Sequence, residues 1–377
     1  MGITGARLRA VLGVGHPGPL GEWPEVAPGT DTLAAEFTKR FGSGPAGVWR
    51  APGRLALMGE HTAAIGGPAL FVALPWGVTA AVDTSEDGRV RLARPSGPLG
   101  DRHRAVVEVT SVVTAARAQG LLRPSQGVRV VFDADLPAHA SLGHSAALGA
   151  AVTLALTELA EADPSNGLPT EPPVAHKVCL LARAGQVVRV NQGSGRLALF
   201  PFDLAAADLR LVVMETGALP RRDPRPARTA QLTRAQESLG PLRAIQDLPA
   251  ALRGLQNPVL RDRVEYAVTE RHRLNAAVGL LREGRFGDVG PILSASHLSL
   301  RRFDLPLPAV GAAVEAATLA GARGARMSGW AGTAFALVSS ERVEEVVTGV
   351  REAFRDRGRP EPRVRVAVPS KGAGRVL

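Results

Sequence analysis

Cysteine and lysine are scarce in this chain. Its 377 residues include one cysteine, Cys179, and three lysines. A single cysteine excludes an intrachain disulfide framework and a cysteine-rich zinc site. No apolar run approaches the roughly 18 residues of a membrane-spanning helix. The first residues hold a short apolar patch broken by Gly and Pro, unlike a secretory signal. We therefore expect a cytoplasmic protein with no membrane partner.

Aromatic residues are also few, and the basic excess comes almost wholly from arginine. There are 45 Lys and Arg against 35 Asp and Glu, so the formal charge is +10, and aromatics make up 4%. The arginines are scattered, with local pairs such as Arg221-Arg222 and no long block. Nucleic-acid-binding surfaces concentrate basic residues on one face and often add aromatics that stack bases. Codon bias explains this composition better, and we expect no nucleic-acid partner.

The length and the hydrophobic pattern predict a two-domain protein. Hydrophobic residues make up 45% and charged residues 21%, as in ordinary globular chains. Apolar or alternating strands at 48–50, 55–58, 128–134 and 209–216 are interleaved with helical patterns such as 32–41 and 343–357. The order lacks strict βαβ alternation, so we predict an α+β fold.

Three segments are candidates for chemistry. In the first, RAPGRLALMGEHT at 50–62, a Pro-Gly turn can project Arg54 from a strand, and Glu60 and His61 follow a glycine. Arginine suits the stabilisation of phosphoryl oxygens. A tight turn with a structural Arg–Glu pair fits the local sequence equally well.

The second and third segments are rich in small residues. LPAHASLGHSAA at 136–147 opens a long apolar helix, whose free N–H groups would favour a phosphate. Small residues also serve helix packing, and His144 is equally compatible with a solvated surface position. RMSGWAGTAFALV at 326–338 is a glycine-bearing turn before an apolar strand.

Together, these segments resemble the motifs of the galactokinases within the GHMP kinases. RAPGRLALMGEHTAAIGGPAL resembles the galactokinase signature, LPAHASLGHSAALGA the phosphate loop, and ARMSGWAGTAFALV the third motif. SHLSLRRFDLPLPAV at 296–310 resembles a further galactokinase segment. The resemblance implies a two-domain GHMP-kinase fold, residues 1–205 and 206–377, with the active-site cleft between the domains. It also implies ATP as cosubstrate and transfer of the γ-phosphoryl group to the anomeric hydroxyl of galactose.

The resemblance also implies roles for particular residues. Arg54 takes the position of the catalytic arginine, and Glu60 and His61 take those of sugar-binding residues. Ser145 is the candidate metal ligand of the phosphate loop. The expected nucleotide-binding residues are Ser141, Gly143, His144, Ser145 and Ala146.

Several positions depart from the family pattern. Ala63 stands where galactokinases have an aspartate that accepts hydrogen bonds from the sugar, a loss on the order of 1–3 kcal/mol. Our alignment places Arg183 at the glutamate that binds magnesium, and Asn191 at the catalytic aspartate. Two like charges 4 Å apart repel by roughly 4 kcal/mol at an effective dielectric of 20, so we do not expect the usual magnesium site. An amide cannot accept the substrate proton, and base catalysis contributes about 10²–10⁴ in rate.

These departures lead to three functional hypotheses. The first is a galactokinase-like protein with impaired turnover, a pseudokinase that binds ATP and a sugar or another small molecule. The second is an active ATP-dependent small-molecule kinase with altered metal and substrate contacts. The third is a regulator that reports a metabolite level to a protein partner.

Overall fold

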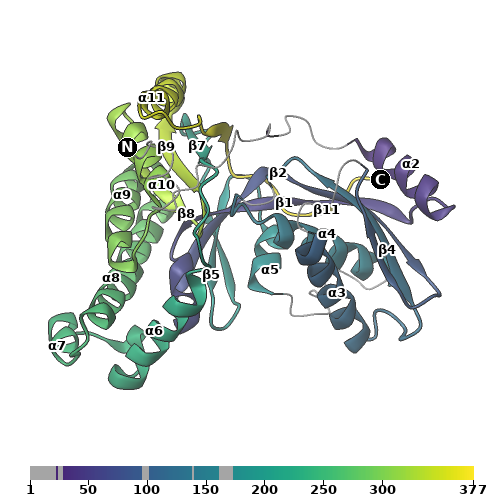
Figure 1. The fold of residues 1–377 in the computed structure, drawn as a ribbon, viewed down its shortest axis with the longest axis horizontal. Coiled ribbons are helices and arrows are strands. Elements are labelled where there is room, and N and C mark those ends of the chain that lie inside the picture. Colours follow the sequence, from purple (N-terminus) through teal and green to yellow (C-terminus); the bar gives the residue numbers. More distant parts are fainter. Residues whose placement is uncertain (1–22, 24–28, 96–101, 138–139, 161–172) are drawn as a thin grey trace, which may run out of the picture.

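Two separate sheets, each covered by helices, make up the computed structural model (Figure 1). The structure describes residues 23, 29–95, 102–137, 140–160 and 173–377. The first sheet has seven strands and the second has four. A cavity lies between elements of the two layers, so the α+β fold with a cleft between domains is confirmed.

The first sheet is built around β2, an 18-residue strand that spans Pro68–Ser85. Its partners are antiparallel: β1 (Gly47–Met58) along one edge, with β4 (Gly127–Ala134) and β5 (Gln186–Asn191) on the other. The remaining strands are β3 (Val90–Ala93), β6 (Leu197–Pro201) and β11 (Gly374–Arg375). Because β2 runs through the whole sheet, the half near β5 is held in register with the half near β4.

Helices cover both faces of the first sheet. Helix α2 (Thr30–Phe41) buries Leu33 and Phe37 against it. On the opposite face lie α3 (Arg102–Ala118), α4 (His144–Leu159) and α5 (Val174–Leu181), as Figure 1 shows. Helix α4 packs on β1 and β2 and between α3 and α5. It is apolar on nearly every side, as expected of a helix surrounded by other elements.

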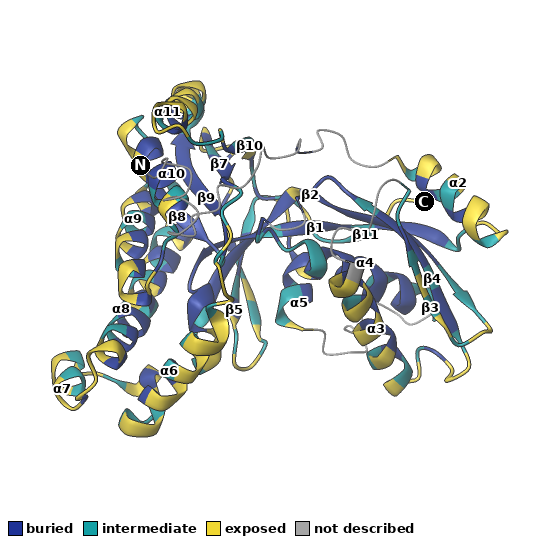
Figure 2. Ribbon diagram, in the orientation of Figure 1, coloured by how far each residue is buried: buried dark blue, intermediate teal, exposed yellow. Residues whose placement is uncertain are grey.

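The second sheet is antiparallel in the order β10-β7-β9-β8. Its strands are β7 (Leu209–Glu215), β8 (Gly324–Ser328), β9 (Thr333–Ser339) and β10 (Arg363–Ala367). Its helices are α6 (Arg225–Leu239), α7 (Leu248–Arg253), α8 (Pro258–Arg282), α9 (Val289–Ser299), α10 (Pro308–Leu319) and α11 (Val343–Asp356). Figure 2 shows buried strands at the centre and exposed residues on the outer surfaces of α6 and α11.

The structure differs from the sequence prediction at two points of the fold. The expected strand–turn–strand over 48–58 is one strand, β1, in which a register shift between Pro52 and Arg54 replaces the turn. Pairing with β2 on both sides of this bulge keeps the strand continuous. At the other end of the chain, β11 pairs with β1, so the last residues return to the first sheet. The second sheet therefore does not extend to residue 377.

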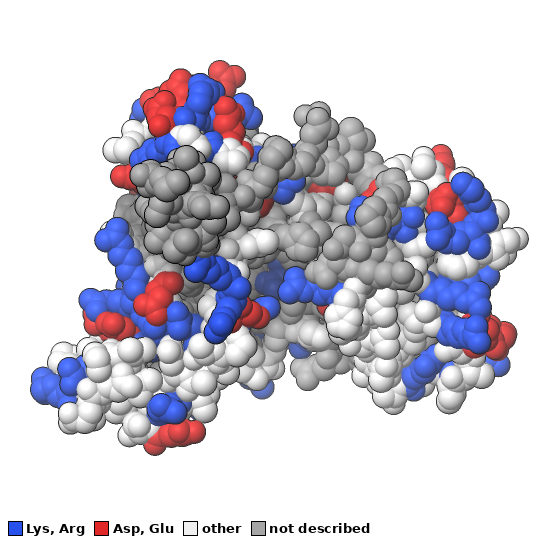
Figure 3. Space-filling model, viewed as in Figure 1, with Lys and Arg blue, Asp and Glu red and all other residues white. Residues whose placement is uncertain are grey.

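No helix in the described part of the chain is long and apolar enough to cross a bilayer. On the face drawn in Figure 3, Lys and Arg are spread over both ends of the molecule, with Asp and Glu among them. This distribution agrees with the scattered arginines of the sequence.

Candidate active site

Residues of all three motifs line one cavity of about 730 Å³. Its lining comes from β1, from the loop before α4 and from the loop between β8 and β9. The residues from 219 to 225, at the start of α6, close one rim. Because the lining residues come from both sheets, this cavity is the cleft between the two layers.

The loop before α4 has the form of a phosphate cradle. Gly143 precedes the helix with φ of +79°, and no side chain caps the helix N-terminus. A Cβ at Gly143 would lie 2.8 Å from Arg54 Cγ, so this glycine is required both for its conformation and for space. His144, Ser145 and Ala146 line the cleft at the first turn of α4. Free N–H groups and the helix dipole favour an anion there.

Arg54 lies against this cradle. Its backbone N–H donates to Leu142 O at 2.8 Å, which fixes β1 to the loop. Its guanidinium carbon lies 4.6 Å from the centre of the Phe71 ring, and its Nε is buried without a partner among the described residues. Burial lowers the pKa of Arg54, although the guanidinium stays charged at neutral pH. The structure thus brings Arg54 and Ser145 into one cavity, as the sequence predicted.

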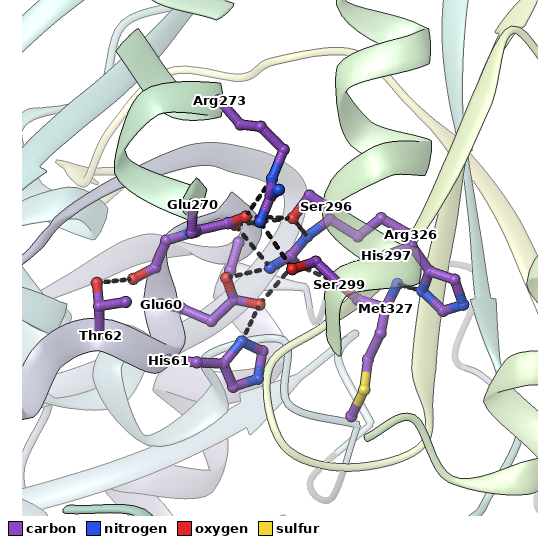
Figure 4. Close-up of polar contacts among 12 residues, drawn as sticks. Glu60, His61, Thr62, Glu270, Arg273, Ser296, His297, Ser299, Arg326 and Met327 are labelled. Atoms are coloured by element: carbon purple, nitrogen blue, oxygen red, sulfur yellow. Dashed lines mark hydrogen bonds and ion pairs between the residues drawn. The ribbon is translucent and has the colours of Figure 1, made fainter. Parts of the chain in front are cut away.

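A buried ion-pair cluster joins the two layers beside the cleft (Figure 4). Arg326 in β8 donates from Nη1 and Nη2 to the two carboxylate oxygens of Glu60, at 2.8 and 3.0 Å. Its Nε donates to Ser296 Oγ at 2.8 Å, and Ser296 donates to Glu270 at 2.7 Å. Burial would raise the pKa of Glu60, but the charge and hydrogen bonds of Arg326 hold it below its usual value. Glu60 is therefore an ionised carboxylate that is already held by protein donors.

His61 is buried behind the cleft. Its Nε2 lies 2.8 Å from Gly329 O, so this nitrogen donates, and Nδ1 lies 3.4 Å from the Tyr266 hydroxyl. Burial lowers the pKa of His61, so the ring is neutral at physiological pH. The ring of Trp330 packs edge-on against it, with centroids 4.4 Å apart. Trp330 lines the cleft and His61 does not, so the indole is the ring that faces the cavity.

Ala63 and Asn191 are the two residues expected near the sugar, and of these two only Ala63 lines the cleft. Ala63 is exposed in the cleft, where a longer side chain would meet a ligand. Asn191 lies at the end of β5, and its Oδ1 accepts from the N–H groups of Gly193 and Ser194 at 3.1 and 3.0 Å. It lines a neighbouring hollow of about 200 Å³, while Gln192 lines the cleft. The strand ends at Asn191, whose side chain caps the following turn, and Gln192 is the first residue of that turn.

Arg183 is not placed where the alignment predicted it. Helix α5 ends at Leu181, and Arg183 is an exposed residue of the turn that leads to β5. It is absent from the described lining of the cleft that holds Ser145. The chain leaves the cleft here because Ala182 O accepts from Gly372 N, which ties this turn to the C-terminal segment. The expected repulsion between Arg183 and a metal ion therefore has no basis in this fold.

A different carboxylate lies on the phosphate side of the cleft. Glu108 in α3 lines the cavity together with Ser145, and its Oε1 lies 2.5 Å from His176 Nε2. Cys179, one turn along α5 from Ala175, is buried, and burial raises the pKa of its thiol to about 12. The described residues contain no group of three His, Cys, Asp or Glu side chains arranged around a metal ion.

These donors still fit the magnesium that the resemblance implies. Magnesium is commonly held by one or two carboxylates together with substrate phosphates, rather than by a full protein cage. Glu108 and Ser145 offer the oxygen atoms it prefers, whereas the neutral thiol of Cys179 does not. When bound, the ion would neutralise phosphate charge, and these two residues would hold it.

Sequence reasoning missed Glu270, Glu108, His176 and Gln192. Arg326 and Ser296 were inside recognised segments without a role. The role of Arg326 could have been inferred from its place in a motif beside an apolar strand. An arginine buried at such a place needs a carboxylate partner. No local signal marked Glu108, since its partner is 68 residues away and on another helix.

Sequence profiles of known families match three parts of the chain. The "galactokinase galactose-binding signature" matches residues 35–84. The "GHMP kinases N terminal domain" matches residues 106–195, and "GHMP kinases C terminal" matches residues 277–356. The matched regions contain all three motifs and most of the cleft.

Whole-chain comparisons agree with the profiles. A galactokinase from Streptomyces coelicolor is 30% identical over 92% of this chain and 98% of its own length. A galactokinase from Mycobacterium tuberculosis is 29% identical over 86% of this chain and 97% of its own. Among solved structures, Lactococcus lactis galactokinase complexed with galactose superposes with a TM-score of 0.76 at 21% identity, covering 92% of this chain and 99% of that one. On these grounds the chain belongs to the galactokinase family of the GHMP kinases.

Proposed function

We propose that this chain binds ATP in the cleft and phosphorylates galactose far more slowly than its relatives. The family reaction is the ATP-dependent phosphorylation of galactose, and ATP is the family's phosphoryl donor. The cradle around Gly143, the Ser145 hydroxyl and the guanidinium of Arg54 support nucleotide binding.

One observation carries the second half of the proposal. Among the described residues, the acceptor side of the cleft presents no carboxylate that is free of a protein cation. Glu60 is held by Arg326, and neutral side chains, Ala63 and Gln192, occupy the neighbouring lining. Gln192 donates from Nε2 to the carbonyl oxygens of Gly59 and Gly67, at 3.1 and 3.0 Å, so it acts as a structural tie. Without a base, the rate falls by about 10²–10⁴.

The test compares this protein with the Streptomyces coelicolor galactokinase in one assay. Calorimetric titration should show ATP binding to both proteins. ADP release that depends on galactose should be at least about 100-fold slower for this protein. Turnover in the ordinary kinase range of roughly 1–100 per second would refute the proposed impairment. Failure to bind ATP would refute the proposal as a whole.

A second candidate function is phosphorylation of an acceptor other than galactose. It is favoured by Trp330, whose indole lines the same cleft as Ala63 and offers an apolar surface to an acceptor. A panel of hexoses, polyols and less polar alcohols tests it. An acceptor that gives rapid ADP release, and whose rate falls in a Trp330→Gly variant, would favour this function over the first.

A further inference from the structure

Glu108 and His176 form a partly buried pair at the phosphate end of the cleft. His176 in α5 is 3% exposed, and its Nε2 lies 2.5 Å from Glu108 Oε1. Among the described residues, the hydrogen bonding of this carboxylate involves Oε1 alone. A ring nitrogen that faces a carboxylate donates to it, so His176 fixes the orientation of Glu108.

The pair lies on the helix face that carries Ser145. A Cβ at Gly149 would lie 2.5 Å from the His176 ring and 2.8 Å from Glu108 Oε1. Ser145 precedes Gly149 by four residues, and residues four apart lie on the same face of a helix, one turn from each other. The absent side chain of Gly149 thus admits the carboxylate against α4, one helical turn from Ser145.

Arg54 and Glu108 both line the cleft that holds Ser145. Cys179 and His176 lie on α5, which packs on α4 beside the phosphate cradle. A cation next to a nucleotide phosphate in this cleft would therefore have a carboxylate within the same lining.

We propose that Glu108, oriented by His176, is the carboxylate that coordinates magnesium when MgATP occupies the cleft, with Ser145 as the second protein ligand. The proposal rests on the proposed ATP binding. The chemistry agrees with the preference of Mg²⁺ for oxygen donors and with its habit of taking one or two carboxylates beside substrate phosphates. His176 is a positioning residue in this arrangement.

The test measures metal-dependent nucleotide binding rather than turnover. ATP is titrated by calorimetry into the wild-type protein and a Glu108→Gln variant, with excess EDTA and then with magnesium. In the wild type, magnesium should tighten ATP binding at least about 10-fold, whereas the variant should lose this gain relative to its own metal-free affinity. Glu345→Gln, an exposed change of equal charge on α11, should behave as the wild type. His176→Ala should weaken the magnesium gain about 10-fold or more relative to its own metal-free affinity.

The outcomes separate this inference from the proposed function. A wild-type protein that binds no ATP refutes both. ATP binding without a magnesium gain, or a gain that survives in Glu108→Gln, refutes only the metal site. A crystal structure of the wild type with magnesium and a non-hydrolysable ATP analogue makes the test independent of how the variant folds. A Glu108 oxygen at about 2.0–2.1 Å from the ion supports the proposal, and a Glu108 with no contact to the ion or its waters overturns it.

Discussion

Arg326 and Glu60 are 266 residues apart in the sequence and meet in a bidentate ion pair that is closed to solvent. The pair joins β8 of the second sheet to the 3-10 helix Glu60–Ile65 that follows β1. Glu270 approaches the same guanidinium from α8, at 3.4 Å. Arg326 thus contacts two buried carboxylates, of which Glu270 also pairs with Arg273 at 3.1 Å, and its position links the two halves of the cleft.

Replacing Arg326 by Met should strongly destabilise the protein. The change leaves Glu60 buried without its cation and Glu270 with Arg273 alone, a loss on the order of 3–5 kcal/mol in the free energy of unfolding. Denaturation by urea measures it. Arg342→Met removes an exposed pair with Glu345 and should leave the unfolding curve nearly unchanged. Equal effects of the two substitutions would contradict the role assigned to the buried cluster.

Acid should destabilise the protein through His297. Burial, with the charges of Arg326 and Arg301, lowers the pKa of His297 to about 4, and its Nδ1 accepts from Met327 N–H at 3.2 Å. The unfolded state takes up the proton near pH 6.5 and the folded state does so only near pH 4. This contribution is therefore complete above pH 6.5 and is lost as the pH falls towards 4, up to about 3 kcal/mol.

Denaturation curves at pH 7 and pH 5 measure how the free energy of unfolding depends on pH. The free energy of unfolding should be lower at pH 5, and a His297→Gln variant should show a smaller difference between the two pH values. The pKa of His61 is also lowered by burial, so part of the difference in the free energy of unfolding between pH 7 and pH 5 should persist in the variant. If the variant lost as much stability between pH 7 and pH 5 as the wild type, His297 would not be the source of this pH dependence.

An aspartate at position 63 should improve the use of galactose. Ala63 is exposed and lines the cleft, so the carboxylate of Ala63→Asp can accept hydrogen bonds from a sugar. We expect kcat/KM for galactose to rise by about 10- to 100-fold, equivalent to roughly 1–3 kcal/mol. Ala64→Asp is the matched control, since Ala64 is also exposed and does not line the cleft. An equal rise of kcat/KM for galactose in both variants, or no rise in either, would contradict the role assigned to position 63.

An alanine at position 143 should abolish tight ATP binding. The residue has φ of +79°, and its Cβ would lie 2.8 Å from Arg54 Cγ, so the cradle must shift. We expect ATP affinity to fall at least about 10-fold in calorimetry. Gly120→Ala, at φ of +76° with nothing within 4 Å, carries the backbone strain of roughly 1–2 kcal/mol without the collision. Its ATP affinity should stay at the wild-type value, and a loss there would mean that strain alone explains the effect.

The sequence alone predicted the features that are formed by residues close together in the chain. The motif residues Arg54, Gly143 and Ser145 lie in one cavity as predicted, because a phosphate cradle is a continuous segment whose glycine and helix start are local properties. The interleaved strands and helices also predicted the α+β class. The missing carboxylate at Ala63 could be read directly, since its segment aligns without a gap.

Only the tertiary structure decided what the other charged residues contact. The sequence predicted Arg183 near the metal and Asn191 near the acceptor, yet neither residue is in the lining of the cleft, since α5 ends before Arg183 and Asn191 caps the turn after β5. Glu60 carried the right chemistry, but its partner Arg326 comes from a distant strand. Glu108 reaches the phosphate side because α3 packs on α4 at a glycine. Ion pairs and cleft linings form between segments far apart in the chain, and one residue of register reverses the face of a side chain, so local patterns do not determine them.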